Sequence, residues 1–296
     1  MSPETIGIAY VLTSACLLAI SQTIAKAVIL RMPFFIFLML RSIGAVTILI
    51  PVTIFLGWKS GPSFTFFAVL ALGGFIWPGV VNILSYNALK VLPANVNRPL
   101  FQTYPAFAFA MSVPLGLGEF SWVKLVGVLL TTAGGGGFAL FNKDAANKSL
   151  RLPRGAVGLV LMAAILQAAG SLVWKYVANT IPGYQTNVLQ SLAAIVFFGS
   201  LAGVELRGRF SKLAKYSWKD LVIAWFSGML LFGIGNTLFF TALKYLDPGP
   251  AGAIYSINIL LTAFVAWISL GEKWTFAQAL SAFMVLGGVV VLSVTL

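Results

Sequence analysis

Asn82-Ile-Leu-Ser-Tyr-Asn-Ala-Leu-Lys90 is a largely apolar stretch that begins with an Asn and ends with a Lys. The pattern returns 154 residues later as Asn236-Thr-Leu-Phe-Phe-Thr-Ala-Leu-Lys244, where six of the nine positions are identical or exchange Tyr for Phe. A single offset of about half the chain indicates a duplicated unit, because solenoid repeats recur every 20–50 residues or so.

The composition predicts an all-α polytopic membrane protein. The 296 residues are 59% hydrophobic and only 9% charged, with a mean hydropathy of +0.97, whereas soluble domains carry about 25% charged residues. The net charge of +12 would suggest nucleic-acid binding in a soluble protein. In a membrane protein, Lys and Arg mark cytoplasmic loops instead, so we expect the lipid bilayer as a partner and no nucleic acid.

Ten apolar runs have the length of about 20 residues that a helix needs to cross a bilayer. They are 6–27, 34–57, 64–90, 96–117, 121–141, 155–178, 184–204, 220–245, 249–270 and 274–295. We therefore expect a five-helix repeat at 1–141, a polar linker at 142–153 and a second five-helix repeat at 154–296. An odd number of spans per repeat makes the second repeat enter the membrane from the opposite side. Transporters use such inverted repeats, with the substrate site near the midplane where the repeats meet.

Further matches between the halves extend the duplication along the chain. Leu40-Arg41-Ser42 corresponds to Leu189-Gln190-Ser191, and each fourth span ends in Leu-Gly-Glu, at Glu119 and Glu272. The doublets Gly135-Gly136 and Gly287-Gly288 also correspond, and we expect them to permit close helix packing.

The positive charges predict the orientation in the membrane. Loops that follow odd-numbered spans, with the adjoining helix ends, hold 14 of the 19 Lys and Arg residues. The positive-inside rule then places these loops in the cytoplasm and both termini outside.

The ionisable residues argue against an enzyme, a metal centre or a cofactor site. All seven acidic residues lie at or beyond the ends of the predicted spans, His is absent, and Cys16 is the single Cys. Embedded carboxylates and His form the proton relays of many transporters, so we predict facilitated or exchange-driven transport without obligate proton coupling.

Neutral polar and aromatic residues mark the candidate substrate site. They gather in spans one, three and four and in their copies six, eight and nine, so we expect these six spans around a central cavity and spans five and ten at its rim. The candidate substrate-binding residues are Tyr10, Ser14, Trp77, Asn82, Tyr86, Gln102, Gln167, Trp174, Asn236, Phe240, Tyr255 and Asn258.

Several of these residues have a structural alternative. Asn82 and Asn236 could bridge helices by hydrogen bonds. Trp77 and, more so, Trp174 could belong to the aromatic belt at the membrane interface. Tyr86 and Phe240 suit core packing equally well. Arg41, about 12 Å into its predicted helix, could bind an anion or extend its side chain to the headgroups.

The chain resembles the drug/metabolite transporter superfamily, in particular ten-span transporters with two EamA repeats. The resemblance rests on Ala88-Leu-Lys90 and Ala242-Leu-Lys244, and on the Leu-Gly-Glu ends with the Gly-rich spans that follow them. Within the superfamily the chain is similar to the YddG branch of aromatic amino-acid exporters. Many relatives have Pro at the position of Asn258, so the gate of the second half could differ.

The resemblance implies a monomeric exporter of amino acids and related small metabolites in the cell inner membrane. Transport would proceed by alternating access through a cavity between the halves. A sugar-phosphate or nucleotide-sugar exchanger of the same superfamily is the main alternative, and it would need cationic cavity residues to bind phosphate. A passive channel is the other, although the sequence has no charged ring or carbonyl filter motif.

Overall fold

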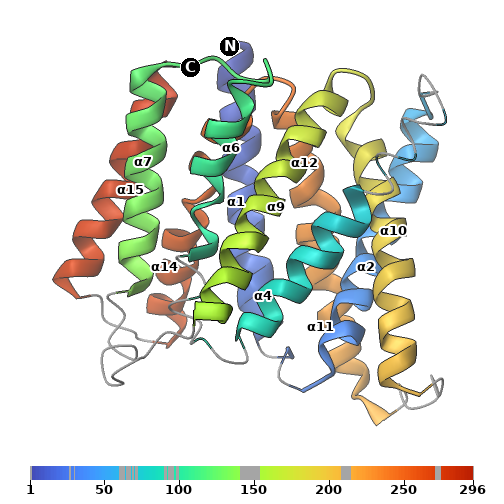
Figure 1. Ribbon diagram of the computed structural model, residues 1–296. Coiled ribbons are helices and arrows are strands. Elements are labelled where there is room, and N and C mark those ends of the chain that lie inside the picture. Colours follow the sequence, from blue (N-terminus) through green and yellow to red (C-terminus); the bar gives the residue numbers. More distant parts are fainter. Residues whose placement is uncertain are drawn as a thin grey trace.

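The structure is a computed structural model that describes residues 2–26, 28–29, 31–59, 73–89, 100–140, 154–207, 215–270 and 275–295, with the single positions 64, 68, 70, 92 and 97. These residues form helices, as the composition predicts, and the helices run side by side (Figure 1). The predicted linker 142–153 and the motif residues Lys90 and Glu272 lie outside the described residues.

The helices follow the order of the predicted spans, five in each half of the described chain. In the first half they are α1 (Pro3–Lys26), α2 (Phe34–Leu56), η1 (Phe75–Val81) with α4 (Asn82–Leu89), α6 (Tyr104–Ser112) and α7 (Trp122–Leu140). In the second half they are α9 (Arg154–Ala178), α10 (Gly183–Glu205), α11 (Trp218–Gly228) with η3 (Met229–Gly235) and α12 (Asn236–Ala242), α13 (Pro248–Tyr255) with α14 (Asn258–Leu270), and α15 (Phe276–Thr295).

Length and apolarity suit six of the described helices to a membrane crossing by themselves. They are Pro3–Ala25, Phe34–Leu56, Arg154–Ala178, Gly183–Glu205, Trp218–Ala242 and Phe276–Val294. The remaining segments are shorter helices that join end to end or border residues outside the described part. Helix α6 ends at Ser112 and is followed by turns, so the fourth span is shorter than the predicted 96–117.

The two halves have opposite directions. In Figure 1, α1 runs from the top of the molecule downward, whereas its counterpart α9 starts at the bottom and runs upward. Both chain ends lie at the top, and this end is called the termini side below. The fold therefore has the inverted-repeat topology that an odd number of spans predicts.

Corresponding helices pack against each other where the halves meet. Helix α2 packs on α10, and α7 packs on α15. A methyl group placed on Gly134 would lie 2.7 Å from the carbonyl oxygen of Ser281 on α15, and one on Gly288 would lie 2.7 Å from that of Gly127 on α7. Glycines thus let the two backbones approach, as in small-xxx-small helix interfaces.

Both copies of the duplicated motif follow a π-helical segment. Segment η1 ends immediately before Asn82, and η3 ends immediately before Asn236. The spans that come next are interrupted as well, by two-residue turns at Gln102-Thr103 and Ser256-Ile257. In a membrane, irregular backbone is tolerated where it is buried in protein or lines a cavity, and π-helical turns are frequent at functional sites.

The two adjacent glycines of α15 provide a matched test of the α7–α15 interface. A methyl group on Gly288 meets Gly127 and Thr131 at 2.7 Å, whereas one on Gly287 meets no atom within 4 Å. Overpacking costs about 1–3 kcal/mol, so Gly288→Ala is expected to lower the thermal midpoint of the purified protein by several degrees, with Gly287→Ala unchanged or slightly stabilised. Equal midpoints for the two variants would contradict this packing.

Candidate functional site

A cavity of about 320 Å³ lies between the two halves. Its wall is formed by α1, η1, α4, α6, α9, η3, α12, α13 and α14, and also by α2 and α10. In the described part of the chain, α7 and α15 contribute no lining residue, in agreement with the prediction that spans five and ten stand at the rim. The volume falls at the lower end of the range of about 300–1,000 Å³ for small-molecule sites.

Seven of the twelve candidate residues line this cavity. They are Trp77, Asn82, Gln102, Gln167, Asn236, Tyr255 and Asn258. Asn82 and Asn236 occupy corresponding positions directly after the two π-helical segments, so the duplication places one amide from each half on the cavity wall.

The other candidates lie elsewhere or are not described. The Ser14 hydroxyl is fully buried and donates a 2.7 Å hydrogen bond to the Gly235 carbonyl. Tyr10 packs near Tyr245, with ring centroids 6.4 Å apart. The side chain of Tyr86 lies outside the described residues.

Trp174 and Phe240 belong to the core behind the cavity wall. Each is 1% exposed, which excludes the interface-belt alternative for Trp174. The Trp174 ring lies 4.0 Å from that of Trp77 and 4.7 Å from that of Phe240. Trp77 in turn donates an indole N–H to the Gln167 side chain. The two buried rings therefore hold Trp77, the aromatic face of the cavity, in one orientation.

Helices α2 and α10 supply lining residues that the sequence analysis did not select. Ser42 comes from α2, and Asn187, Gln190 and Ser191 come from α10. The signal was present in the matched segments 40–42 and 189–191, which carry polar residues inside otherwise apolar spans. The census by span missed them because it placed only spans one, three and four and their copies around the cavity, although the first half of α10 carries several polar residues.

Asn187 stabilises the irregular backbone of the opposite wall. Its side-chain N–H₂ donates to the carbonyls of Phe232 and Gly233 at 2.7 and 2.9 Å, and lies 2.8 Å from the Thr237 hydroxyl. Both carbonyls belong to η3, where the wide π-helical turn alters the regular hydrogen-bond pattern. This amide has thus a clear structural role at the cavity surface.

Two lining amides have polar atoms without a hydrogen-bond partner among the described residues. Both side-chain atoms of Gln190 and the Nε2 of Gln102 are buried and unpaired, and the two residues are 2% and 8% exposed. Buried polar groups are paired in the large majority of cases. These amides are therefore suited to receive the polar groups of a bound molecule.

Arg41 lies just behind the wall. Its guanidinium donates a 2.8 Å hydrogen bond to the Ser21 hydroxyl and stands over the Phe232 ring, 4.4 Å from the centroid. The residue is 7% exposed, so its side chain is held inside the protein and does not extend to the headgroups. Every described lining residue is uncharged.

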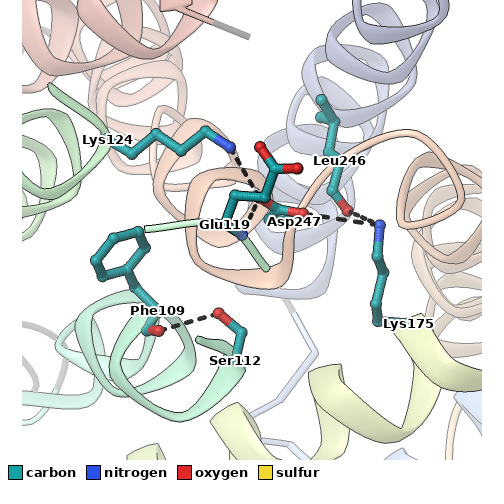
Figure 2. Close-up of polar contacts among 7 residues, drawn as sticks. All are labelled: Phe109, Ser112, Glu119, Lys124, Lys175, Leu246 and Asp247. Carbon is teal, nitrogen blue, oxygen red and sulfur yellow. Dashed lines mark hydrogen bonds and ion pairs between the residues drawn. The ribbon is translucent and has the colours of Figure 1, made fainter. Parts of the chain in front are cut away.

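On the termini side, one carboxylate connects the two halves (Figure 2). Asp247 accepts a 3.0 Å contact from Lys124 of α7 and a 3.3 Å hydrogen bond from the backbone N–H of Glu119. Lys175 of α9 lies 3.9 Å from the same carboxylate and donates to the Leu246 carbonyl at 3.0 Å. First-half and second-half elements are thereby joined through a single acidic side chain.

The described residues contain no group of three or more His, Cys, Asp or Glu side chains that could hold a metal ion. The ion pairs among the described residues lie near helix ends, as with Arg31 and Asp220 at 3.3 Å.

Comparison with known proteins agrees with this architecture. The model of the EamA-like transporter family matches residues 5–136 and 154–294, one stretch in each half. The chain belongs to the EamA-like transporter family. It is therefore a multi-pass membrane transporter of small molecules and not an enzyme.

A search of curated proteins gives no match. Among solved structures, 29 chains match. One of them, described only as "Crystal structure of protein", is 15% identical with a TM-score of 0.81, and the alignment covers 100% of this chain and 99% of that one. At this identity the likeness shows the shared fold.

Asp247→Asn tests the connection between the halves. The change leaves Lys124 and Lys175 close together without a carboxylate, and hydrogen bonds to charged groups contribute about 1.5–3 kcal/mol each. We expect the thermal midpoint to fall by about 3–8 °C, because 1 kcal/mol corresponds to about 2–4 °C in a large domain. Asp220→Asn is the control, since its partner Arg31 is 66% exposed and exposed pairs contribute about 0–1 kcal/mol. A midpoint that falls no further for Asp247→Asn than for Asp220→Asn would contradict the role of this carboxylate.

Proposed function

We propose that the protein exports amino acids, aromatic and other neutral ones, and related small metabolites across the cell inner membrane. The observation that carries this proposal is the wall of the cavity, which combines neutral amides with aromatic rings and has no charged side chain among the described lining residues. Binding sites for small molecules are typically apolar with a few well-placed polar groups.

The lining matches the parts of a zwitterionic amino acid. The unpaired amide atoms of Gln102 and Gln190 can donate to a carboxylate or accept from an ammonium group. Trp77 and Tyr255 offer aromatic faces to an apolar side chain and to a cation. The same chemistry supports the finer assignment to the YddG branch of amino-acid exporters.

Alternating access is the mechanism that this arrangement supports. The cavity lies where the inverted halves meet, and a rocking motion of one half against the other would expose it to each side in turn. The Asp247 contacts join the halves on the termini side, so they would have to break when that side opens. We further propose that the termini side faces outward, because in the predicted topology the odd-numbered loops lie opposite the termini, and the sequence gives these loops and the adjoining helix ends 14 of the 19 Lys and Arg residues.

The competing functions are less well supported. A sugar-phosphate or nucleotide-sugar exchanger needs cations that contact phosphate, but no described lining residue is cationic and Lys175 interacts with Asp247. The small cavity also suits a single amino acid better than a nucleotide sugar. A passive channel would need an open path, and it would not show saturation or counterflow.

The proposal is tested by transport in proteoliposomes. The purified protein is assayed with twenty amino acids and with phosphorylated sugars, with a pH-sensitive dye inside the vesicles. We expect saturable flux and counterflow with neutral and aromatic amino acids and no obligate proton movement. Uptake of phosphorylated sugars alone would overturn the proposal, and flux that rises linearly with concentration would favour a channel.

Asn82→Leu tests the role of the duplicated amide. A hydrogen bond between polar groups in a membrane contributes about 0.6–2 kcal/mol, so flux at low substrate concentration is expected to fall about 3- to 30-fold. The control is Asn87→Leu, an exposed position on the same helix. Folded protein, measured by gel filtration, should be unchanged in both variants. Wild-type flux in Asn82→Leu would assign Asn82 a structural role only.

A further inference from the structure

Arg41 is a cation that the helix packing fixes deep inside the protein. A methyl group on Gly228 would overlap the Arg41 main chain, and one on Gly44 would overlap the Trp225 carbonyl oxygen. Helix α2 therefore touches α11 backbone to backbone at this level. Arg41 is 7% exposed at this close contact.

Among the described residues, the groups around the guanidinium are polar or aromatic, and none of them is a carboxylate. The Ser21 hydroxyl accepts a 2.8 Å hydrogen bond from the guanidinium and donates one of 2.7 Å to the Ser227 carbonyl. The Phe37 and Phe232 rings lie 5.4 and 4.4 Å from the guanidinium carbon. The Nε atom is buried without a partner. The hydrogen-bonding capacity of the group is thus only partly used.

No described carboxylate forms an ion pair with Arg41. Asp220 pairs with Arg31, and Asp247 pairs with Lys124 and Lys175. A buried charge is normally paired, because removing it from water is costly. The positive charge of Arg41 is therefore left uncompensated within the described part of the chain, and intramembrane charges are generally functional.

This charge is close to the substrate cavity. Phe232, whose ring lies against the guanidinium, is itself a lining residue. Ser42, the next residue along α2, also lines the cavity, as does Gln22, the residue after Ser21. One layer of side chains separates the charge from the cavity. The corresponding position in the second half is the neutral Gln190. The positive potential in the cavity is therefore strongest on the side next to Arg41.

We propose that Arg41 makes the cavity selective for substrates that bear a carboxylate, and that the carboxylate lies at the end next to Phe232, Ser42 and Gln22. This inference rests on the function proposed above and narrows it to carboxylate-bearing metabolites. Arg41 acts as a specificity-determining residue through its field, without contacting the substrate. With an effective dielectric constant of about 20, one unit charge at about 12 Å changes binding about tenfold.

The test compares three ligands that share a phenyl side chain. L-phenylalanine has both an ammonium and a carboxylate group, 3-phenylpropionate has only the carboxylate, and phenethylamine has only the ammonium. Affinities for the purified wild-type protein and its variants are measured by calorimetry. The readout is the ratio of the affinities for 3-phenylpropionate and phenethylamine, which a general loss of folded protein does not change.

We expect the wild type to favour the carboxylate about tenfold or more. Arg41→Gln, which installs the residue of the second half, should remove most of this preference, whereas Arg41→Lys should keep it. Arg31→Gln is the matched control on an exposed Arg and should leave the ratio unchanged. Phe232→Leu uncovers the guanidinium and keeps its charge, so this variant should raise the affinity ratio. It provides the test if Arg41→Gln does not fold.

The outcomes separate the two proposals. Equal wild-type affinity for the carboxylate and the amine, an unchanged ratio in Arg41→Gln, or a lower ratio in Phe232→Leu overturns the role of Arg41 alone. A wild type that binds none of the three ligands overturns the proposed function together with this inference. Tighter binding of phenyl phosphate than of 3-phenylpropionate would overturn the carboxylate assignment in favour of phosphate.

Discussion

The need to satisfy every backbone polar group inside the bilayer governs this structure. Regular helices meet that need alone, so departures from them are confined to places where the protein supplies partners. The π-helical segments η1 and η3 and the turns at 102–103 and 256–257 all border the cavity. Asn187 is an example, because its side-chain amide donates hydrogen bonds to two carbonyls of η3. A membrane transporter can thus build a polar cavity only beside side chains that also maintain its backbone.

Because the repeat is duplicated, each half contains one such π-helical segment beside the cavity. The same motif follows a π-helical segment at Asn82 and at Asn236, and both amides line the cavity. The inverted arrangement brings these two sites together across the junction of the halves. The packing around the cavity also follows the duplication, since α2 pairs with α10 and α7 with α15. A short sequence repeat therefore specifies both the outline of the fold and two of the amides that line the cavity.

The sequence predicted the ten-helix, inverted-repeat fold because apolar length and odd span number are properties of the chain itself. It predicted the site less well. A polar residue within a span is expected to avoid lipid, but its polarity does not tell whether it lines a cavity or forms a buried hydrogen bond. Ser14, Trp174 and Phe240 are of the expected types, yet they pack behind the wall. Ser42 and Gln190 line the cavity, although their spans were not expected to border it. The π-helical segments leave no periodic signal in seven apolar residues.

The two repeats differ at one buried position, where the first has Arg41 and the second has Gln190. This difference affects how a substrate can be oriented in the cavity. A fully symmetric duplicate would let a dipolar cargo bind in either of two opposed poses with equal energy. In the proposed role of Arg41, its guanidinium on one side of the cavity makes the two poses unequal in energy. A zwitterion would then bind in one orientation. The two access routes would then meet different ends of the same molecule, while the concentration gradients would still set the direction of net transport.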